Sequence, residues 1–99
     1  MSYPAIPGQR LVISNAELIR CTSYERENRV LWRHWFRTPQ GPVVYTGTML
    51  PVATGQIVTV KGTCKRFEQV YGESVMRISR PKIICGFDTK KVDRLGLLI

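Results

Sequence analysis

Hydrophobic and polar residues alternate along most of this chain, which is the two-residue period of β-strands. The clearest case is the segment 29–37, which holds both tryptophans and the single histidine. One side of this segment carries Val30, Trp32, His34 and Phe36, and the other carries Leu31, Arg33, Trp35 and Arg37. We predict a strand whose first side, Trp32 included, packs in the core and whose second side faces outward.

The same alternation, divided by turn residues, predicts five strands over 11–24, 29–38, 43–48, 56–67 and 74–84. Segments 25–28 and 39–42 have turn chemistry, and Tyr71-Gly72 is predicted to close the last hairpin. Gly47 indicates a barrel corner or a close backbone approach, and Pro81 predicts an edge or a bulge. The first strand is long enough to bend near Ser14-Asn15, and 49–55 is predicted to be a loop or a single turn.

Five short strands with almost no helical periodicity predict an all-β fold, a small five-stranded OB-type barrel over residues 10–87. An SH3-like barrel is the alternative. Residues 1–9 are expected to form an extended arm, and 88–99 a short helix and apolar tail. The tail ends in Leu97, Leu98 and Ile99, which either dock on the barrel itself or on a partner, including a second copy of the chain.

Composition and charge narrow the class of protein. The 99 residues carry a net charge of +8, with 43% hydrophobic and 22% charged residues, which is typical of one folded domain. We see no signal peptide and no apolar run long enough to span a membrane. The three cysteines are widely spaced and lack a C-x-x-C, so we expect reduced thiols in a cytoplasmic protein rather than a zinc site.

Enzyme chemistry is not predicted. The chain has no G-x-x-x-x-G-K-[ST] motif, and its seven carboxylates show no paired arrangement. His34 lies on the predicted core side of its strand, so we interpret it as a packed or rim residue rather than a general base. No cofactor or metal is expected.

Part of the chain resembles a known family. Residues 45–63 contain Gly47, Leu50-Pro51, Gly55 and the run Val58-Thr59-Val60-Lys61-Gly62, and the chain continues through Tyr71-Gly72-Glu73 to Met76-Arg77-Ile78. This pattern resembles the small OB domain that opens bacterial RecD-like helicases, over about residues 28–84. There, G-x-LP-x-x-x-x-G-x-x-V-x-V-x-G precedes a YGE hairpin and a final strand. The chain departs from it by inserting Met49.

A second, shorter likeness covers three segments, Lys65-Arg66-Phe67, Tyr71-Gly72 and Met76-Arg77-Ile78. Together they resemble the end of small phage single-strand-binding proteins. Both resemblances imply an OB barrel that handles single-stranded DNA in replication, recombination or repair in a phage, plasmid or bacterium. Neither implies a helicase activity.

The basic residues point to the same function. Between Arg29 and Lys82 the sequence has nine basic residues and only two acidic ones, Glu68 and Glu73. Arginine pairs with phosphate and aromatic rings stack on bases, so we predict low-specificity binding of single-stranded DNA, with RNA as a second possibility. The candidate binding residues are Arg33, Trp35, Arg37, Tyr45, Lys61, Lys65, Arg66, Phe67, Tyr71, Arg77, Arg80 and Lys82. The alternative is a small adaptor or structural subunit whose basic face meets an acidic protein partner.

Overall fold

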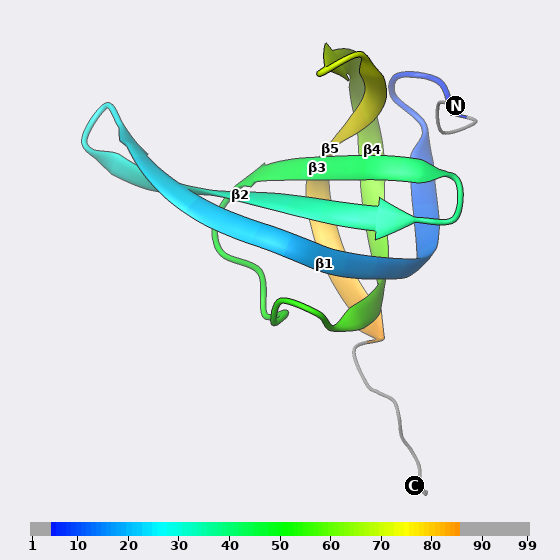
Figure 1. Ribbon diagram of the computed structural model, residues 1–99, viewed down its shortest axis with the longest axis horizontal. Coiled ribbons are helices and arrows are strands. Elements are labelled where there is room, and N and C mark those ends of the chain that lie inside the picture. The colour runs from blue at the N-terminus through cyan, green and yellow to red at the C-terminus, as the bar shows by residue number, and fades with distance from the viewer. Residues whose placement is uncertain (1–4, 86–99) are drawn as a thin grey trace, which may run out of the picture.

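The computed structural model describes residues 5–85, which form five strands (Figure 1). The strands are β1 (Arg10–Arg26), β2 (Arg29–Thr38), β3 (Gly41–Gly47), β4 (Ile57–Val70) and β5 (Glu73–Cys85). The predicted bounds of β2 are confirmed, and the other strands are longer than predicted or begin earlier because pairing continues into the turns. The segment 49–55 is a loop, as expected. The predicted helix over 88–99 and the apolar terminus lie outside the described residues.

The strands close into a barrel in the order β1-β2-β3-β5-β4. Strands β3 and β5 run parallel, and all the other neighbours are antiparallel. Closure depends on β1, whose first part pairs with β4 and whose second part pairs with β2. The register shifts between Ile13 and Ala16, where Asn15 has a φ of 54°, so the predicted bend is a β-bulge. The prediction of a small five-stranded all-β barrel is confirmed.

The core fills the inside of this barrel with side chains from every strand. The buried cluster consists of Ile13, Ala16, Leu18, Phe36, Val43, Leu50, Val58, Val60, Cys64, Met76 and Ile78. Gly62 belongs to the same face of β4, and a Cβ placed there would lie 3.0 Å from Ile78 Cδ1. The lack of a side chain at Gly62 therefore lets β5 pack closely against this face of β4.

His34 is fully buried and ties the 49–55 loop to the barrel. Its Nε2 accepts a hydrogen bond from Leu50 N at 3.1 Å. A backbone N–H only donates, so Nε2 is unprotonated, and the proton on Nδ1 is donated to the Tyr45 carbonyl oxygen at 3.2 Å. Burial lowers the pKa of His34. The interpretation of His34 as a packed residue is confirmed.

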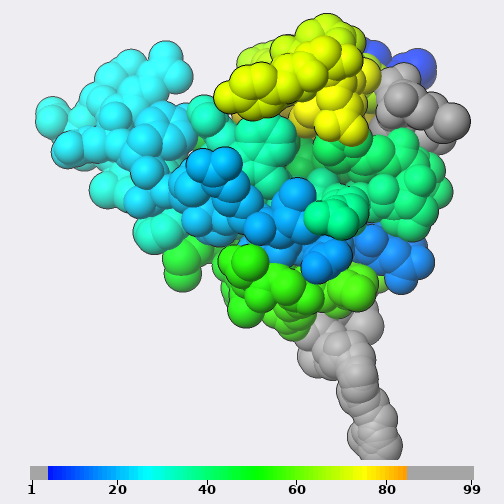
Figure 2. Space-filling view, viewed as in Figure 1, coloured from blue at the N-terminus to red at the C-terminus, as the bar shows by residue number. Residues whose placement is uncertain are grey.

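The predicted core side of β2 is only half correct. His34 and Phe36 are buried, but Val30 is 58% exposed and Trp32 is half-buried and absent from the core cluster. The reason is that the β1–β2 hairpin continues past the barrel as a two-stranded ribbon (Figures 1 and 2). Trp32 lies at the base of this ribbon, opposite Ser23 of β1 and Gly47, the last residue of β3, where the barrel covers it only in part.

Two tight turns shape the surface. Glu27 and Asn28 join β1 to β2 with φ values of 52° and 64°, and Tyr71 and Gly72 join β4 to β5 with 52° and 79°. Positive φ at both central residues is the requirement of a two-residue type I′ hairpin. The predicted Tyr71-Gly72 turn is confirmed, and Pro81 lies at the predicted irregularity, where the β4–β5 register shifts.

Within residues 5–85 no helix is of the length and apolarity that would span a bilayer.

Candidate nucleic-acid interface

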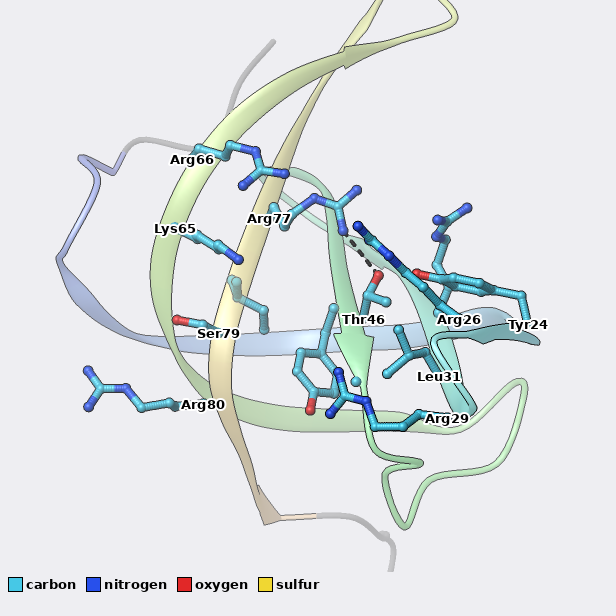
Figure 3. Close-up of a pocket in the computed structure, with 14 residues that line it drawn as sticks. Tyr24, Arg26, Arg29, Leu31, Thr46, Lys65, Arg66, Arg77, Ser79 and Arg80 are labelled. Carbon is cyan, nitrogen blue, oxygen red and sulfur yellow. Dashed lines mark hydrogen bonds between the residues drawn. The ribbon is translucent and has the colours of Figure 1, made fainter.

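A groove of about 480 Å³ lies between the β1–β2 hairpin and strands β4 and β5, with β3 at its floor (Figure 3). Two walls face each other across it: Tyr24, Arg26 and Leu31 on one side, and Lys65, Arg66 and Arg77 on the other. The lining residues are Tyr24, Arg26, Arg29, Leu31, Arg33, Tyr45, Thr46, Gly47, Lys65, Arg66, Arg77, Ile78, Ser79 and Arg80. We call this the hairpin groove.

The hairpin groove is strongly cationic. Six arginines and one lysine line it, and none of its described lining residues is an aspartate or glutamate. Two tyrosines lie among these cations. Low-dielectric walls lined by one sign of charge focus the electrostatic field and attract a polyanion.

Arg33 lies in the hairpin groove with its side chain oriented by an aromatic ring. Its guanidinium carbon lies 5.1 Å from the centroid of the Tyr24 ring, a cation–π contact. Its Nε is buried and has no hydrogen-bond partner, and Arg33 forms no ion pair within residues 5–85. The positive charge of Arg33 therefore remains available to an incoming anion.

Arg77 faces the same floor from β5. Its Nη1 donates to Thr46 Oγ1 at 3.0 Å, and Thr46 is the cross-strand partner of Arg33. The Arg77 side chain is only 19% exposed, and its Nε is buried without a partner. Two arginines thus approach the Thr46 position from different strands, each with a buried Nε that has no hydrogen-bond partner among residues 5–85.

Glu68 partly neutralises one wall. Its carboxylate accepts a hydrogen bond from Arg66 Nε at 2.6 Å and another from Arg77 Nη2 at 3.0 Å. These two hydrogen bonds, Arg77 first, lower the pKa of Glu68 to about 2. Because Arg66 and Arg77 are direct cross-strand partners, Glu68 also screens their mutual repulsion.

Tyr45 occupies the inner end of the hairpin groove. Its ring centroid lies 5.4 Å from that of His34 and packs against the core. A Cβ at Gly47 would collide with the Tyr45 phenol, so the predicted close approach at Gly47 is the approach of this ring. Gly47 therefore makes the room that lets Tyr45 reach the groove.

The structure brings half of the predicted binding residues into the hairpin groove: Arg33, Tyr45, Lys65, Arg66, Arg77 and Arg80. The others lie elsewhere. Trp35 and Arg37 line a second hollow of about 270 Å³ with Ile19, Pro42 and Glu73. Phe67 is half-buried against the core, and Tyr71 is fully exposed at its hairpin tip. Lys61 and Lys82 are cross-strand partners outside the groove lining.

Sequence reasoning missed one wall of the groove. This wall consists of Tyr24, Arg26 and Arg29 of the β1–β2 hairpin. The sequence pattern predicts only a strand end and a charged turn in this region. Thr46, which positions Arg77, was missed as well. The available signal was the two-residue spacing of Tyr24 and Arg26, which repeats the aromatic–arginine alternation of β2.

Comparison with known proteins does not assign this chain to a family. No family model, no curated protein and no solved structure matches it. In residues 5–85, no three histidine, cysteine, aspartate or glutamate side chains cluster in a way that would hold a metal ion. The polar side chains that line the hairpin groove are cations, phenols and hydroxyls.

Proposed function

We propose that this protein binds single-stranded nucleic acid, with single-stranded DNA preferred and little sequence preference, through the hairpin groove. The observation that carries the proposal is the convergence of seven basic residues and two tyrosines, from all five strands, on one groove with no acidic residue among its described lining. A positively charged groove that contacts phosphates, combined with rings on which bases stack, is the general design of single-strand binding surfaces.

The position of the groove supports the same proposal. It lies between the β1–β2 and β4–β5 hairpins, across the β2–β3 face (Figure 3). In OB-type barrels this is the face that binds oligonucleotides. The proposed RecD-like relationship rests on about residues 28–84, which supply β2 to β5 of this barrel, and the phage single-strand-binding likeness rests on segments within 65–78. A role in replication, recombination or repair is part of the proposal.

The second hollow extends the proposed interface along β2. Trp35 lies two residues from Arg33 on the same face of the strand, which is about 7 Å. Trp35 is half-buried and lines the second hollow. A strand bound at Arg33 therefore reaches Trp35 within about one nucleotide, and we keep Trp35 as a stacking residue of the proposed interface.

The two tryptophans provide the experiment, because they lie on opposite faces of β2. In the variant Trp32→Phe, Trp35 is the only tryptophan, and in Trp35→Phe, Trp32 is the only one. We expect a single-stranded oligonucleotide to quench the fluorescence of Trp32→Phe strongly and that of Trp35→Phe weakly. Equal quenching in both variants, or none in either, would contradict a stacking role for Trp35.

Binding is measured in parallel by fluorescence anisotropy with single-stranded DNA, duplex DNA and RNA. Affinity for the single strand should fall with salt at a log–log slope of about −0.7 per contacted phosphate. Arg33→Ala together with Lys65→Ala should weaken it at every salt concentration, while Ala53→Glu/Thr54→Glu, which makes the same change in net charge on the exposed 49–55 loop outside both hollows, is the control. If an acidic polypeptide binds and the oligonucleotide does not, the adaptor function replaces this one.

A further inference from the structure

A second group of basic residues lies beyond the hairpin groove, on the outer surface formed by β1, β4 and β5. Its members are Arg10, Lys61, Arg80 and Lys82, and we call it the outer track. Lys61 lies directly opposite Lys82, and Arg10 lies opposite Thr63, two residues along β4 from Lys61. Period-two alternation therefore places Arg10, Lys61 and Thr63 on one face of the sheet.

Arg10 and Arg80 are held next to each other by one hydroxyl group. Arg10 Nη1 donates to Thr63 Oγ1 at 3.0 Å and to the Arg80 carbonyl oxygen at 2.8 Å. Arg80 Nη2 donates to the same Thr63 Oγ1 at 3.4 Å. Arg80 lies at the β5 register shift with a φ of 51°, a conformation that non-glycine residues adopt at a cost. The fold thus accepts backbone strain where it brings two guanidinium groups together.

The outer track has no internal neutralisation. None of its four cations forms an ion pair with a carboxylate among residues 5–85. Like charges directly opposite each other on neighbouring strands are destabilising, and Lys61 and Lys82 are such a pair. A polyanion bound between the two lysines would relieve this repulsion.

Arg80 connects the two surfaces. It is a lining residue of the hairpin groove, yet its side chain extends away from Lys65, Arg66 and Arg77 in Figure 3, toward the Thr63 contact. Lys65 and Lys61 are four residues apart on β4, which is about 13 Å. The cationic surface is therefore continuous from the groove to the Lys61–Lys82 pair.

We infer that a single strand leaving the hairpin groove continues over Arg10 and Arg80 and ends its contacts on Lys61 and Lys82. The inference rests on the proposed function and deepens it, because it makes the site longer than the groove and assigns Arg10 a role that the sequence did not reveal. The outer track contacts phosphates only, since none of its residues is aromatic, so it adds length dependence and salt dependence rather than base preference.

The test compares two oligothymidylates, of about 4 and about 12 nucleotides, within the range of site sizes for one OB-type barrel. The groove variant is Arg33→Ala/Lys65→Ala, and the track variant is Lys61→Ala/Lys82→Ala. We expect the groove variant to weaken both oligonucleotides. The track variant should weaken only the longer one and reduce the magnitude of its salt slope by about 1.4, which corresponds to two phosphates. Thermal unfolding of each variant confirms that the fold is kept.

The outcomes separate the two hypotheses. If the groove variant weakens both oligonucleotides and the track variant weakens neither, the outer track is refuted and the proposed function stands. If the track variant weakens both oligonucleotides equally, the lysines act through net charge alone and the inference is also refuted. If the unsubstituted protein binds neither oligonucleotide, the proposed function itself fails.

Discussion

The guanidinium group of Arg33 lies over the ring of Tyr24, with 5.1 Å between its central carbon and the ring centroid. The two residues belong to β2 and β1: Arg33 also pairs with Thr46 of β3, and Tyr24 pairs with Leu31 beyond the end of β3. The ring supports the guanidinium group, which forms no ion pair within residues 5–85. The β1–β2 hairpin is therefore a preorganised part of the proposed interface rather than a passive extension.

Arg33→Lys tests this preorganisation. Lysine keeps the charge but has neither the planar group nor the fork of donors, so we expect single-strand affinity to fall by about 0.5–1 kcal/mol with little change in the salt slope. Arg33→Ala should cost more and also reduce the magnitude of the slope by about 0.7, because one phosphate contact is lost. Anisotropy titrations over a range of salt concentrations measure both quantities. Equal behaviour of the two variants would show that stacking on Tyr24 has no role.

Glu68→Gln should strengthen nucleic-acid binding while weakening the fold. The substitution releases Arg66 and Arg77 from the carboxylate, so we expect roughly three- to tenfold tighter binding and a steeper salt dependence. The free energy of unfolding at neutral pH should fall by about 1 kcal/mol, because the carboxylate is 29% exposed and such pairs are partly screened. Glu17→Gln makes the same change in net charge away from these arginines. Equal tightening in both variants would attribute the effect to net charge.

The low pKa of Glu68 gives a second measurement on the same variant. The folded pKa is about 2 and the ordinary value is 4.5, so the ionised form stabilises the fold above pH 4.5. This contribution is lost as the pH falls from 4.5 through 2. Urea unfolding of the unsubstituted protein should therefore show a steeper loss of stability in this range than Glu68→Gln. Parallel profiles would mean that the Arg66–Glu68–Arg77 cluster does not stabilise the fold.

His34 predicts a separate pH dependence nearer neutrality. Burial lowers its folded pKa below the unfolded value near 6.5, so the unfolded chain takes up the proton first as the pH falls. Stability should be complete above about pH 6.5 and should decrease as the pH falls toward the folded pKa. The chain has no other histidine, so urea unfolding between pH 7 and 5.5 isolates this group. In His34→Leu we expect a flat profile and a lower overall stability, by about 2 kcal/mol, because Leu50 N and the Tyr45 carbonyl lose their partner.

Substitution of Tyr71 is expected to raise the stability of the fold and to weaken nucleic-acid binding. It lies at the tip of the β4–β5 hairpin with a positive φ and a fully exposed ring, so nothing in the described fold explains the choice of tyrosine there. Asparagine adopts this conformation at lower cost, so Tyr71→Asn should raise the free energy of unfolding by about 0.5–1 kcal/mol. If the ring stacks on a base, the same variant should lose about 1 kcal/mol of binding free energy. Unchanged affinity in the stabilised variant would remove Tyr71 from the interface.

The sequence by itself determined the strands and turns, because these depend on local chemistry. The alternation over 29–38 predicted β2 with the observed bounds, and Tyr71-Gly72 specified its turn because a tight hairpin needs positive φ. It could not determine burial along the whole of β2. Trp32 and His34 share a face of the strand, yet only His34 is covered, because coverage depends on how far the barrel extends beneath the ribbon.

The tertiary structure alone decided which charges meet. Arg33 and Arg77 are far apart in the sequence, yet Arg33 lies opposite Thr46 in the β2–β3 pair and Arg77 donates to Thr46 from β5, because β3 pairs with both β2 and β5. Arg10 meets Arg80 because β1 bends from β2 to β4 and closes the barrel. Neither contact leaves a local pattern, since each depends on strand order and register. The sequence thus predicted a basic and aromatic barrel, and only its closure divided that surface into a groove and an outer track.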